Sequence, residues 1–509
     1  MRNRIFYYSI LAAFFFLSCS DSFLDEQQTG TLTTESALTS PESAIALANG
    51  AYVNTTVFNE QAFSFGGNTF LLLEYMTGKV TSENSQSNFK EFQDVALSAR
   101  TPYVEEWWRG CYAGIAKCNL AIQKLPEYKG LIDDDLISKL TGEVKFMRAI
   151  YYYYLVRIFG DVPKIMVPQV DLDELQVSRS PLKEIYDEII IPDLLTAESA
   201  PIPFKEQTGR VSMAAVKALL ADVYLTYAGY PVQGGTEFYA QSAKRSLEII
   251  NSGEYSLFQN YEELWNPLNN NSGEFIFQVQ FSVNKRSNEL VPGVLPSRSG
   301  MSAFNLEYGS LIPTLEFVDS YVEGDKRAEE KQFFFTTYKG NPIKFSPGAP
   351  ELEYIDFVAP YIHKYFDQTA IDEVGQSGLN QTIYRYADVL LMYAEAQASA
   401  DGTANAQAME SLNLIRLRAN LPEFNNTGED AFIKEVWNQR YFELSYENKM
   451  WFDMIRTRLI RDDGTGEYVN FAGYINNWGK SYSETNLLFP LPLTEIQANS
   501  NLVQNPGYN

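Results

Sequence analysis

Apolar residues recur at helical spacing through much of the chain. Ser40, Pro41 and Glu42 mark the start of one helix, because Ser is a favoured N-cap and Pro fits the first helical turn. Apolar positions spaced by three and four residues predict further helices over 108–119, over 139–159, after Ser180 and over 212–227. Because these segments are separated by short connections, we expect helices that pack in antiparallel pairs.

The pattern changes after residue 252. Residues 274–281 form a short alternating run of polar and apolar side chains, which predicts a strand. The chain is then rich in Gly, Pro, Asn and Ser up to about residue 360. Helical spacing returns over 384–399, 406–419 and 429–458, with a break expected near Asn448. The sequence predicts a mainly α protein, with a tetratricopeptide-like helical-hairpin scaffold at about 36–252 and 384–509. A loop-rich insertion at about 253–383 carries a few short strands.

The N-terminal segment has the order of an export signal. Arg2 and Arg4 precede an apolar run over 5–17, and Ser18 supplies the small residue before Cys19. This run is shorter than the roughly 20 residues of a membrane span. Residues 16–19 resemble a lipobox, in which Cys19 is acylated, although a plain secretory signal with a chance cysteine remains the alternative. We expect a signal peptide at 1–18, a lipidated tether at 19–28 and a single body at 29–509.

Composition narrows the classes of partner. The chain has 509 residues, is 45% hydrophobic and carries a formal charge of −24. Removing Arg2 and Arg4 with the signal leaves 38 basic against 64 acidic residues, or −26. Such a surface repels polyanions, so we expect neither nucleic-acid binding nor electrostatic docking on anionic lipid. Attachment to a membrane would therefore depend on the acyl chains.

The few cysteines and the single histidine exclude several chemistries. Cys111 and Cys118 are seven residues apart on one predicted helix, roughly 10 Å at 1.5 Å per residue, which exceeds disulfide reach. We expect both to be buried packing residues. His363 alone cannot make a His-rich metal site, and the chain has no EF-hand loop, so no metal-binding residue and no cofactor is assigned. A Ca²⁺ site made from carboxylates and carbonyls stays an open alternative.

Three blocks of sequence resemble the SusD/RagB family of nutrient-binding lipoproteins. They are residues 142–163, ending in Phe-Gly-Asp-Val-Pro; residues 384–396 with Arg440, Glu443, Glu447 and 451–453; and residues 488–492 with 504–508. Asn448 departs from the family pattern, which usually has Gly there. Physically the blocks look like scaffold: we expect Arg385, Asp388 and Glu395 to pair with neighbouring helices, and Arg440, Glu443 and Glu447 to form ion pairs on one helix face.

The resemblance implies a SusD-like fold and a binding protein without catalysis. Such a protein is lipid-anchored to the cell outer membrane, facing the exterior. It captures an oligosaccharide, sometimes a peptide, and acts as a lid over a SusC-like TonB-dependent transporter.

No ligand-binding residue is carried over from the family, whose sites are aromatic arcs built from variable loops. A sugar site needs a ring face for stacking, flanked by amides and carboxylates that bind hydroxyl groups. We expect it among aromatic and amide residues in Gly-rich or polar segments, where burial does not explain the ring. These candidates are Phe65, Asn68, Asn88, Phe89, Phe304, Tyr308, Trp478 and Tyr482.

Two other classes of protein are compatible with the composition. A secreted helical glycoside hydrolase would use two carboxylates about 5 to 10 Å apart, a distance that sequence cannot give. A structural or assembly protein of the cell surface would bind neither glycan nor peptide.

Overall fold

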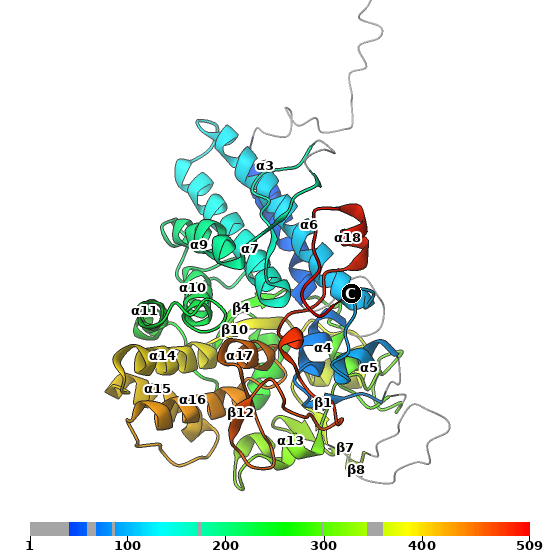
Figure 1. The fold of residues 1–509 in the computed structure, drawn as a ribbon. Coiled ribbons are helices and arrows are strands. Elements are labelled where there is room, and N and C mark those ends of the chain that lie inside the picture. Colours follow the sequence, from blue (N-terminus) through cyan, green and yellow to red (C-terminus); the bar gives the residue numbers. More distant parts are fainter. Residues whose placement is uncertain are drawn as a thin grey trace, which may run out of the picture.

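Helices form most of the molecule, as predicted, and strands occur only in short pairs within the described part of the chain (Figure 1). The computed structural model describes residues 40–58, 68–83, 87–170, 175–297, 299–343 and 360–508. The longest helices are α6 (Pro102–Lys124) and α7 (Asp134–Phe159), which pack against each other. The mainly α fold class with a loop-rich insertion is therefore confirmed.

The other α-helices among the described residues are α3 (Pro41–Asn49), α4 (Asn68–Tyr75), α5 (Ser87–Gln93), α8 (Leu182–Ile185), α9 (Ile191–Glu198), α10 (Met213–Ala228), α11 (Thr236–Ser252), α12 (Leu290–Gly293), α13 (Leu315–Asp319), α14 (Tyr386–Asp401), α15 (Ala406–Arg418), α16 (Glu429–Glu443), α17 (Met450–Thr457) and α18 (Leu493–Ala498). The paired strands are β1 (Val80–Thr81) with β5 (Ile312–Pro313), β2 (Val162–Pro163) with β3 (Arg179–Ser180), β4 (Phe275–Val279) with β10 (Gln381–Arg385), β6 (Phe334–Phe335) with β9 (Tyr361–Ile362), β7 (Thr337–Tyr338) with β8 (Asn341–Pro342), and β11 (Leu459–Arg461) with β12 (Tyr468–Asn470).

Side-chain caps set the helix boundaries. Ser40 caps α3 in a capping box with Ser43, and the side chain of Ser212 accepts a hydrogen bond at the start of α10, both as predicted. The sequence places the start of α7 at residue 139, but the helix begins at Asp134. The reason is Asp133, whose carboxylate accepts the N–H groups of Asp135 and Leu136 and so satisfies two donors of the first turn.

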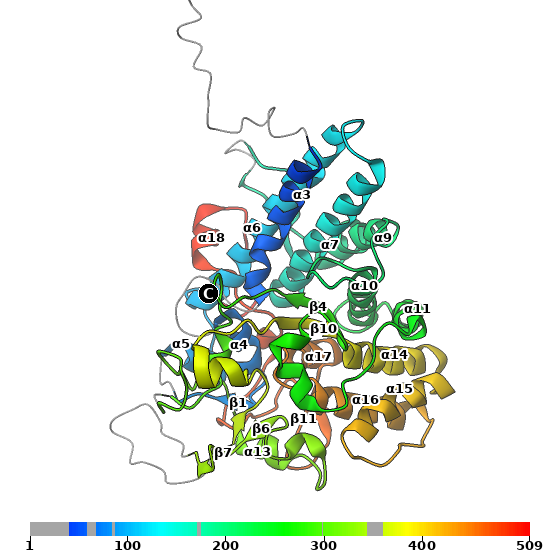
Figure 2. The same cartoon turned by 180° about the vertical axis from the view of Figure 1, so that it is seen from behind.

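The helices stack in sequence order until the insertion interrupts them. α7 packs on α6 and α9, and α10 packs on α9 and α11. The next neighbour of α11 is α14, although the residues between them form the whole loop-rich region. Figures 1 and 2 show α10, α11, α14, α15 and α16 as one continuous layer of helices. The insertion therefore leaves the scaffold after α11 and returns to it at α14.

The two ends of the insertion are joined by a short antiparallel pair. β4 pairs with β10, with Val279 opposite Gln381 and Phe275 opposite Arg385. The helix predicted from residue 384 begins only at Tyr386, because the preceding residues form β10. We call this β4–β10 pair the neck of the insertion.

Aromatic rings fill the core of the helical scaffold. Trp107 is fully buried and stacks on Tyr154, with the ring centroids 5.3 Å apart. Trp108 packs against Tyr112, as their helical spacing indicates. Cys111 and Cys118 are buried and form no disulfide, as predicted. The high aromatic content thus serves packing to a large extent.

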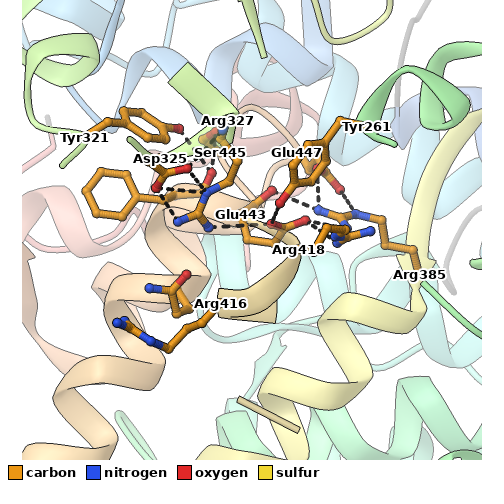
Figure 3. Close-up of polar contacts among 12 residues, drawn as sticks. Tyr261, Tyr321, Asp325, Arg327, Arg385, Arg416, Arg418, Glu443, Ser445 and Glu447 are labelled. Atoms are coloured by element: carbon orange, nitrogen blue, oxygen red, sulfur yellow. Dashed lines mark hydrogen bonds and ion pairs between the residues drawn. The ribbon is translucent and has the colours of Figure 1, made fainter. Parts of the chain in front are cut away.

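A buried cluster of charges lies next to the neck (Figure 3). Arg385, the last residue of β10, binds the carboxylates of Glu274 at 2.6 Å, Glu443 at 2.9 Å and Glu447 at 2.8 Å. Arg418 binds Glu274 and Glu443 at 2.6 and 2.7 Å. We call the set of these five residues with Asp325, Arg327 and Lys364 the ion network.

The insertion supplies Asp325, Arg327 and Lys364 to the ion network, in addition to Glu274 of its neck. Lys364 binds Glu447 at 2.6 Å, and Arg327 lies 3.5 Å from Glu443 and 2.7 Å from Asp325. Burial alone would raise the pKa of Glu443, but the attraction of Arg418, Arg385 and Arg327 outweighs it and holds that pKa well below its usual range. Four cations thus face four carboxylates, and the network joins the insertion to the ends of α15 and α16.

Arg440, Glu443 and Glu447 do not form the ion pairs expected on one helix face. Arg440 instead binds Asp388 of α14 at 3.1 Å and Asp453 of α17 at 2.9 Å. Glu443 and Glu447 bind the cations of the ion network, because the chain leaves α16 before Glu447 and turns inward. The expected pairing of Asp388, Glu395 and Arg385 with other elements is confirmed, Glu395 by its ion pair with Arg456.

Asn448 marks the predicted break between α16 and α17. Its φ is 55°, in the left-handed region that favours glycine. Asn is one of the few other residues that adopt this conformation readily, which explains why it can replace the Gly of the family pattern.

Glu443→Gln is expected to destabilise the protein strongly. The substitution keeps the shape of the side chain but leaves three buried arginines short of a counter-charge, which should lower the free energy of unfolding by about 3–5 kcal/mol. Urea denaturation measures this loss. Glu467→Gln is the matched control: it breaks an ion pair with Lys434 whose side chains are 64% and 41% exposed, and it should cost less than about 1 kcal/mol. Equal losses for the two variants would contradict the role given to the network.

Candidate functional site

Three segments far apart in the sequence meet on the side of the molecule opposite α11 (Figures 1 and 2). The first, 76–83 with 87–95, follows α4 and contains β1 and α5; the second, 299–313, ends in β5; the third is 473–482. β1 and β5 pair, the side-chain amide of Asn476 donates to the backbone of Gln93 at 3.1 Å, and the hydroxyl of Tyr482 donates to the backbone of Met76 at 2.7 Å. We call these segments the loop cluster.

Most of the candidate residues predicted from the sequence belong to the loop cluster or border it. Asn68 begins α4, and Asn88 and Phe89 are in the first turn of α5, but their side chains lie outside what the structure describes. Phe65 lies wholly outside the described residues. Phe304 and Tyr308 are partly buried in the second segment, and Trp478 is in the third. The structure thus brings the three described regions that carry these residues to one side of the molecule.

Glu83 organises the junction of the first two segments. Its backbone N–H donates to the carbonyl of Gly309 at 2.9 Å, and its carboxylate accepts hydrogen bonds from the N–H of Ser297 and, at 2.6 Å, from the hydroxyl of Tyr361. Gly309 has a φ of +53°, and a Cβ atom there would overlap Oε2 of Glu83. Only glycine therefore allows the loop to approach this carboxylate so closely.

Glu307 folds the loop that carries Phe304. The residue is 4% exposed, and its carboxylate accepts four hydrogen bonds of 2.7–2.9 Å, from the hydroxyls of Ser299 and Ser302 and the N–H groups of Gly300 and Ser302. A buried carboxylate that is satisfied by four donors fixes a loop in one conformation. Residues 299–307 therefore hold one fixed conformation at the surface.

Trp478 is the most exposed aromatic residue among the described residues of the loop cluster. It is 37% exposed at a turn that Asn476 holds in place. The side-chain oxygen of Asn476, which is buried, accepts the N–H groups of Trp478 and Lys480, each at 3.0 Å. Because its backbone is fixed, Trp478 can offer a ring face to a ligand at little cost in conformational entropy.

Tyr482 does not offer a ring face to a ligand, contrary to the expectation from its Gly-rich surroundings. It is 1% exposed and packs against Phe471 and Tyr474, with ring centroids 5.0 and 6.2 Å away. Its hydroxyl donates a hydrogen bond to the backbone carbonyl of Met76, and burial raises the pKa of this hydroxyl. Tyr482 therefore holds the third segment against the turn after α4, which is a structural role.

A groove of about 780 Å³ lies away from the loop cluster, between α6, the segment after β2 and α18. Of its two aromatic residues, Trp108 is only 3% exposed, and Tyr112 is partly buried and donates its hydroxyl to the carbonyl of Pro163 at 2.9 Å. The amides of Gln176 and Asn499 are already used, because they donate to the backbone of Ala498 and Val177 at 2.8 Å. These hydrogen bonds hold the C-terminal segment against the scaffold, and the groove is also lined by the charged residues Arg109 and Glu495.

Sequence reasoning missed Glu83, Glu307 and Asn476, which position the candidate rings. For Glu307 a signal was present, because it is a lone carboxylate in a loop rich in Ser and Gly, where its acceptor atoms can collect several backbone donors. For Glu83 no local signal existed, since Ser297 and Tyr361 are hundreds of residues away in the sequence. For Asn476 a local signal was present, because an Asn shortly before a Gly favours a turn in which its side chain accepts nearby backbone N–H groups.

Neither a metal-binding cluster nor a membrane-spanning helix occurs among the described residues. No group of three or more His, Cys, Asp or Glu side chains there is arranged to hold a metal ion. No described helix combines the length and the apolar character that crossing a bilayer requires.

Comparisons with known proteins identify the family. The profile described as the SusD family matches residues 356–508, and the profile described as "Starch-binding associating with outer membrane" matches residues 22–225. The crystal structure of a SusD superfamily protein from Parabacteroides distasonis is 64% identical, with a TM-score of 0.87 over 94% of this chain and 100% of that one. The chain therefore belongs to the SusD superfamily.

More distant relatives agree with this assignment. SusD-like protein P2 of Formosa agariphila is 27% identical, and the match covers 97% of each chain. The starch-binding protein SusD of Bacteroides thetaiotaomicron is 24% identical, with 75% of each chain covered. The resemblance read from the three sequence blocks is thus confirmed.

Gly309→Ala is expected to disturb the loop cluster. The left-handed backbone alone makes Ala unfavourable by about 1–2 kcal/mol, and the overlap with Glu83 should add at least about 1 kcal/mol. Gly300→Ala is the matched control, because Gly300 has a similar φ of +65° in the same loop but no atom within 4 Å of the position that a Cβ atom would take. The two free energies of unfolding, compared by urea denaturation, measure the cost of the overlap; a difference near zero would show that Glu83 can move aside.

Proposed function

We propose that this protein is a surface-exposed, lipid-anchored binding protein that captures oligosaccharide and delivers it to a SusC-like TonB-dependent transporter, without catalysis. The observation that carries the proposal is membership of a superfamily in which a relative that spans most of this chain is named as starch-binding. The match to a family described as associating with the outer membrane supports the proposed location.

The loop cluster supports a carbohydrate site of the stacking type. Trp478 has an exposed ring on a fixed turn, and Asn477 beside it carries an exposed amide that lies 3.4 Å from Glu316. A ring face flanked by an amide and a carboxylate provides both the stacking and the hydrogen bonds that a sugar requires. Phe304 and Tyr308, on the loop that Glu307 fixes, supply further rings on the same side of the molecule.

Handover to a transporter is the second step of the proposal. A protein tethered through Cys19 would stay at the outer surface of the membrane, where a β-barrel transporter is embedded. The protein itself acts as the lid of the barrel. When it closes on the barrel, the ligand passes from the binding surface to the transporter, with no change in the ligand's covalent structure.

The buried carboxylates of the core do not support the hydrolase alternative, although their pKa values are shifted. Burial raises the pKa of Glu74 to about 8, but its side chain is 1% exposed and therefore out of reach of a polysaccharide. Glu443 and Glu447 are engaged by cations of the ion network. Binding without hydrolysis is therefore the function that we prefer.

Trp478→Ala is expected to weaken oligosaccharide binding about tenfold, because it removes the stacking surface, which corresponds to about 1.4 kcal/mol. The soluble body, residues 20–509, is first screened on an array of starch, fructan, β-glucan and host-glycan oligosaccharides together with peptides. The best ligand is then titrated calorimetrically. Phe424→Ala, which removes a partly buried ring on the α15–α16 connection, is the matched control and should bind as the unaltered protein does. Absence of any glycan or peptide ligand would favour a structural role, and shortening of the oligosaccharide would favour the hydrolase.

The full-length protein is expected to copurify with a β-barrel TonB-dependent transporter from detergent-solubilised outer membranes. Mass spectrometry of its N-terminus should show acyl chains on Cys19. Cys19→Ala, which cannot be acylated, should leave the membrane fraction and lose the transporter. Recovery of the acylated protein without a barrel would contradict the handover step, whereas recovery of an unmodified periplasmic protein would contradict the anchor.

A further inference from the structure

A cavity of about 280 Å³ lies between the end of α7, α17 and the C-terminal segment. Its volume is close to the lower limit for pockets that bind small molecules. The floor includes the buried side chains of Val156 and Phe452, while Tyr230, 41% exposed, and Glu484, also exposed, lie at the rim. The cavity is therefore open to solvent at one side and apolar at its base.

Arg458 brings to the wall of this cavity a cation that no described carboxylate holds in an ion pair. Its Nη1 atom is buried and makes no hydrogen bond to any described residue. Glu484 attracts it from the rim, but no ion pair joins Arg458 to a described carboxylate. Its aromatic neighbour is Tyr230, with the guanidinium 5.1 Å from the ring centroid. A guanidinium stays charged in proteins, and leaving one of its donors buried without a partner is costly.

The backbone of Arg458 is also in an uncommon conformation. It ends α17 with a φ of 62° and a ψ of 22°, the left-handed region in which a helix usually ends on Gly or Asn. A non-glycine residue held there is strained, and such strain is concentrated at functional sites. The side chain of this arginine lines the cavity instead of extending into solvent, where its charge would be fully hydrated.

The other cations of the wall already have partners. Arg456 binds Asp453 at 2.7 Å and pairs with Glu395 as well. Arg157 is sandwiched between the rings of Tyr153 and Phe452, 3.6 and 3.7 Å from their centroids, and lies 3.9 Å from Asp222. Among the described residues of the wall, Arg458 is therefore the cation whose charge is not balanced by an ion pair.

We propose that this cavity binds a small organic anion, with its carboxylate on Arg458 and its apolar body against Phe452, Ile455 and Leu182. A carboxylate binds the part of the guanidinium that lines the cavity, which no described carboxylate holds in an ion pair. The apolar body displaces water from side chains that are otherwise hydrated in an open cavity. This site is separate from the loop cluster and does not depend on carbohydrate binding.

Calorimetric titration with phenylacetate tests the proposal, with phenylacetamide and acetate as comparison ligands. Phenylacetate should bind saturably, and the uncharged amide and the acid without an apolar body should each bind at least tenfold more weakly. This comparison uses the unaltered protein and so does not depend on the folding of any variant. Equal binding of acid and amide, or no saturable binding of phenylacetate at millimolar concentration, would overturn the proposal.

Arg458→Gln should reduce phenylacetate binding at least tenfold, and Arg458→Lys, which keeps the positive charge, should restore part of it. Arg100→Gln is the matched control, because Arg100 is an exposed arginine outside the cavity. Circular dichroism and the melting temperature establish that the variants are folded. Full binding by a folded Arg458→Gln variant would overturn the assignment of the carboxylate to this arginine.

Discussion

The ion network at the neck of the insertion is the constraint on which the arrangement of the loops depends. Eight charged side chains meet there, and the single carboxylate of Glu443 contacts three arginines, Arg385, Arg418 and Arg327 (Figure 3). Removing ions from water costs several kcal/mol for each ion, and mutual attraction offsets that cost only when the geometry is good and the remaining donors are satisfied. Loss of one member would therefore leave other buried charges short of a partner, which couples the docking of the insertion to the scaffold residues of the network.

The network explains how a loop-rich region can hold a defined binding surface. The described part of the insertion has two-stranded sheets and short helices but few long elements of its own. Its position is fixed at the neck by the pairing of β4 with β10, and deeper by Lys364, which donates to the backbone of Glu443 and Ser445 at 2.9 and 2.8 Å. Outward from this anchor, β1 pairs with β5 and Glu83 binds Tyr361. The loop cluster is thus connected to the scaffold through a chain of satisfied polar contacts.

The sequence allowed the helices to be predicted well because their signals are local. Caps such as Ser40 and Ser212 and the apolar spacing of α10 act within a few residues. The partners of Glu443 and Glu447 were missed because Arg385 and Lys364 are far away in sequence, so helix-face spacing suggested the wrong pairs. Tyr482 was misjudged for the same reason: neighbouring glycines indicate an exposed turn, but its burial is created by Phe471 and by the turn after α4. Local patterns therefore predicted the framework, whereas the site depends on long-range contacts.

The shifted pKa values of the core fit a framework role better than a catalytic one. Burial raises the pKa of Glu74 to about 8 and lowers that of Lys364 to about 8, while Glu447, close to both, keeps a pKa below its usual value because Arg385 and Lys364 outweigh the effect of its burial. In an active site, two carboxyl groups with pKa values pushed apart would mark an acid and a base. Here Glu74 accepts the N–H of Asn448 and Glu447 joins the ion network, so both hold the break after α16 in place. A perturbed pKa indicates function only where a substrate can reach the group, and neither of these buried side chains meets that condition.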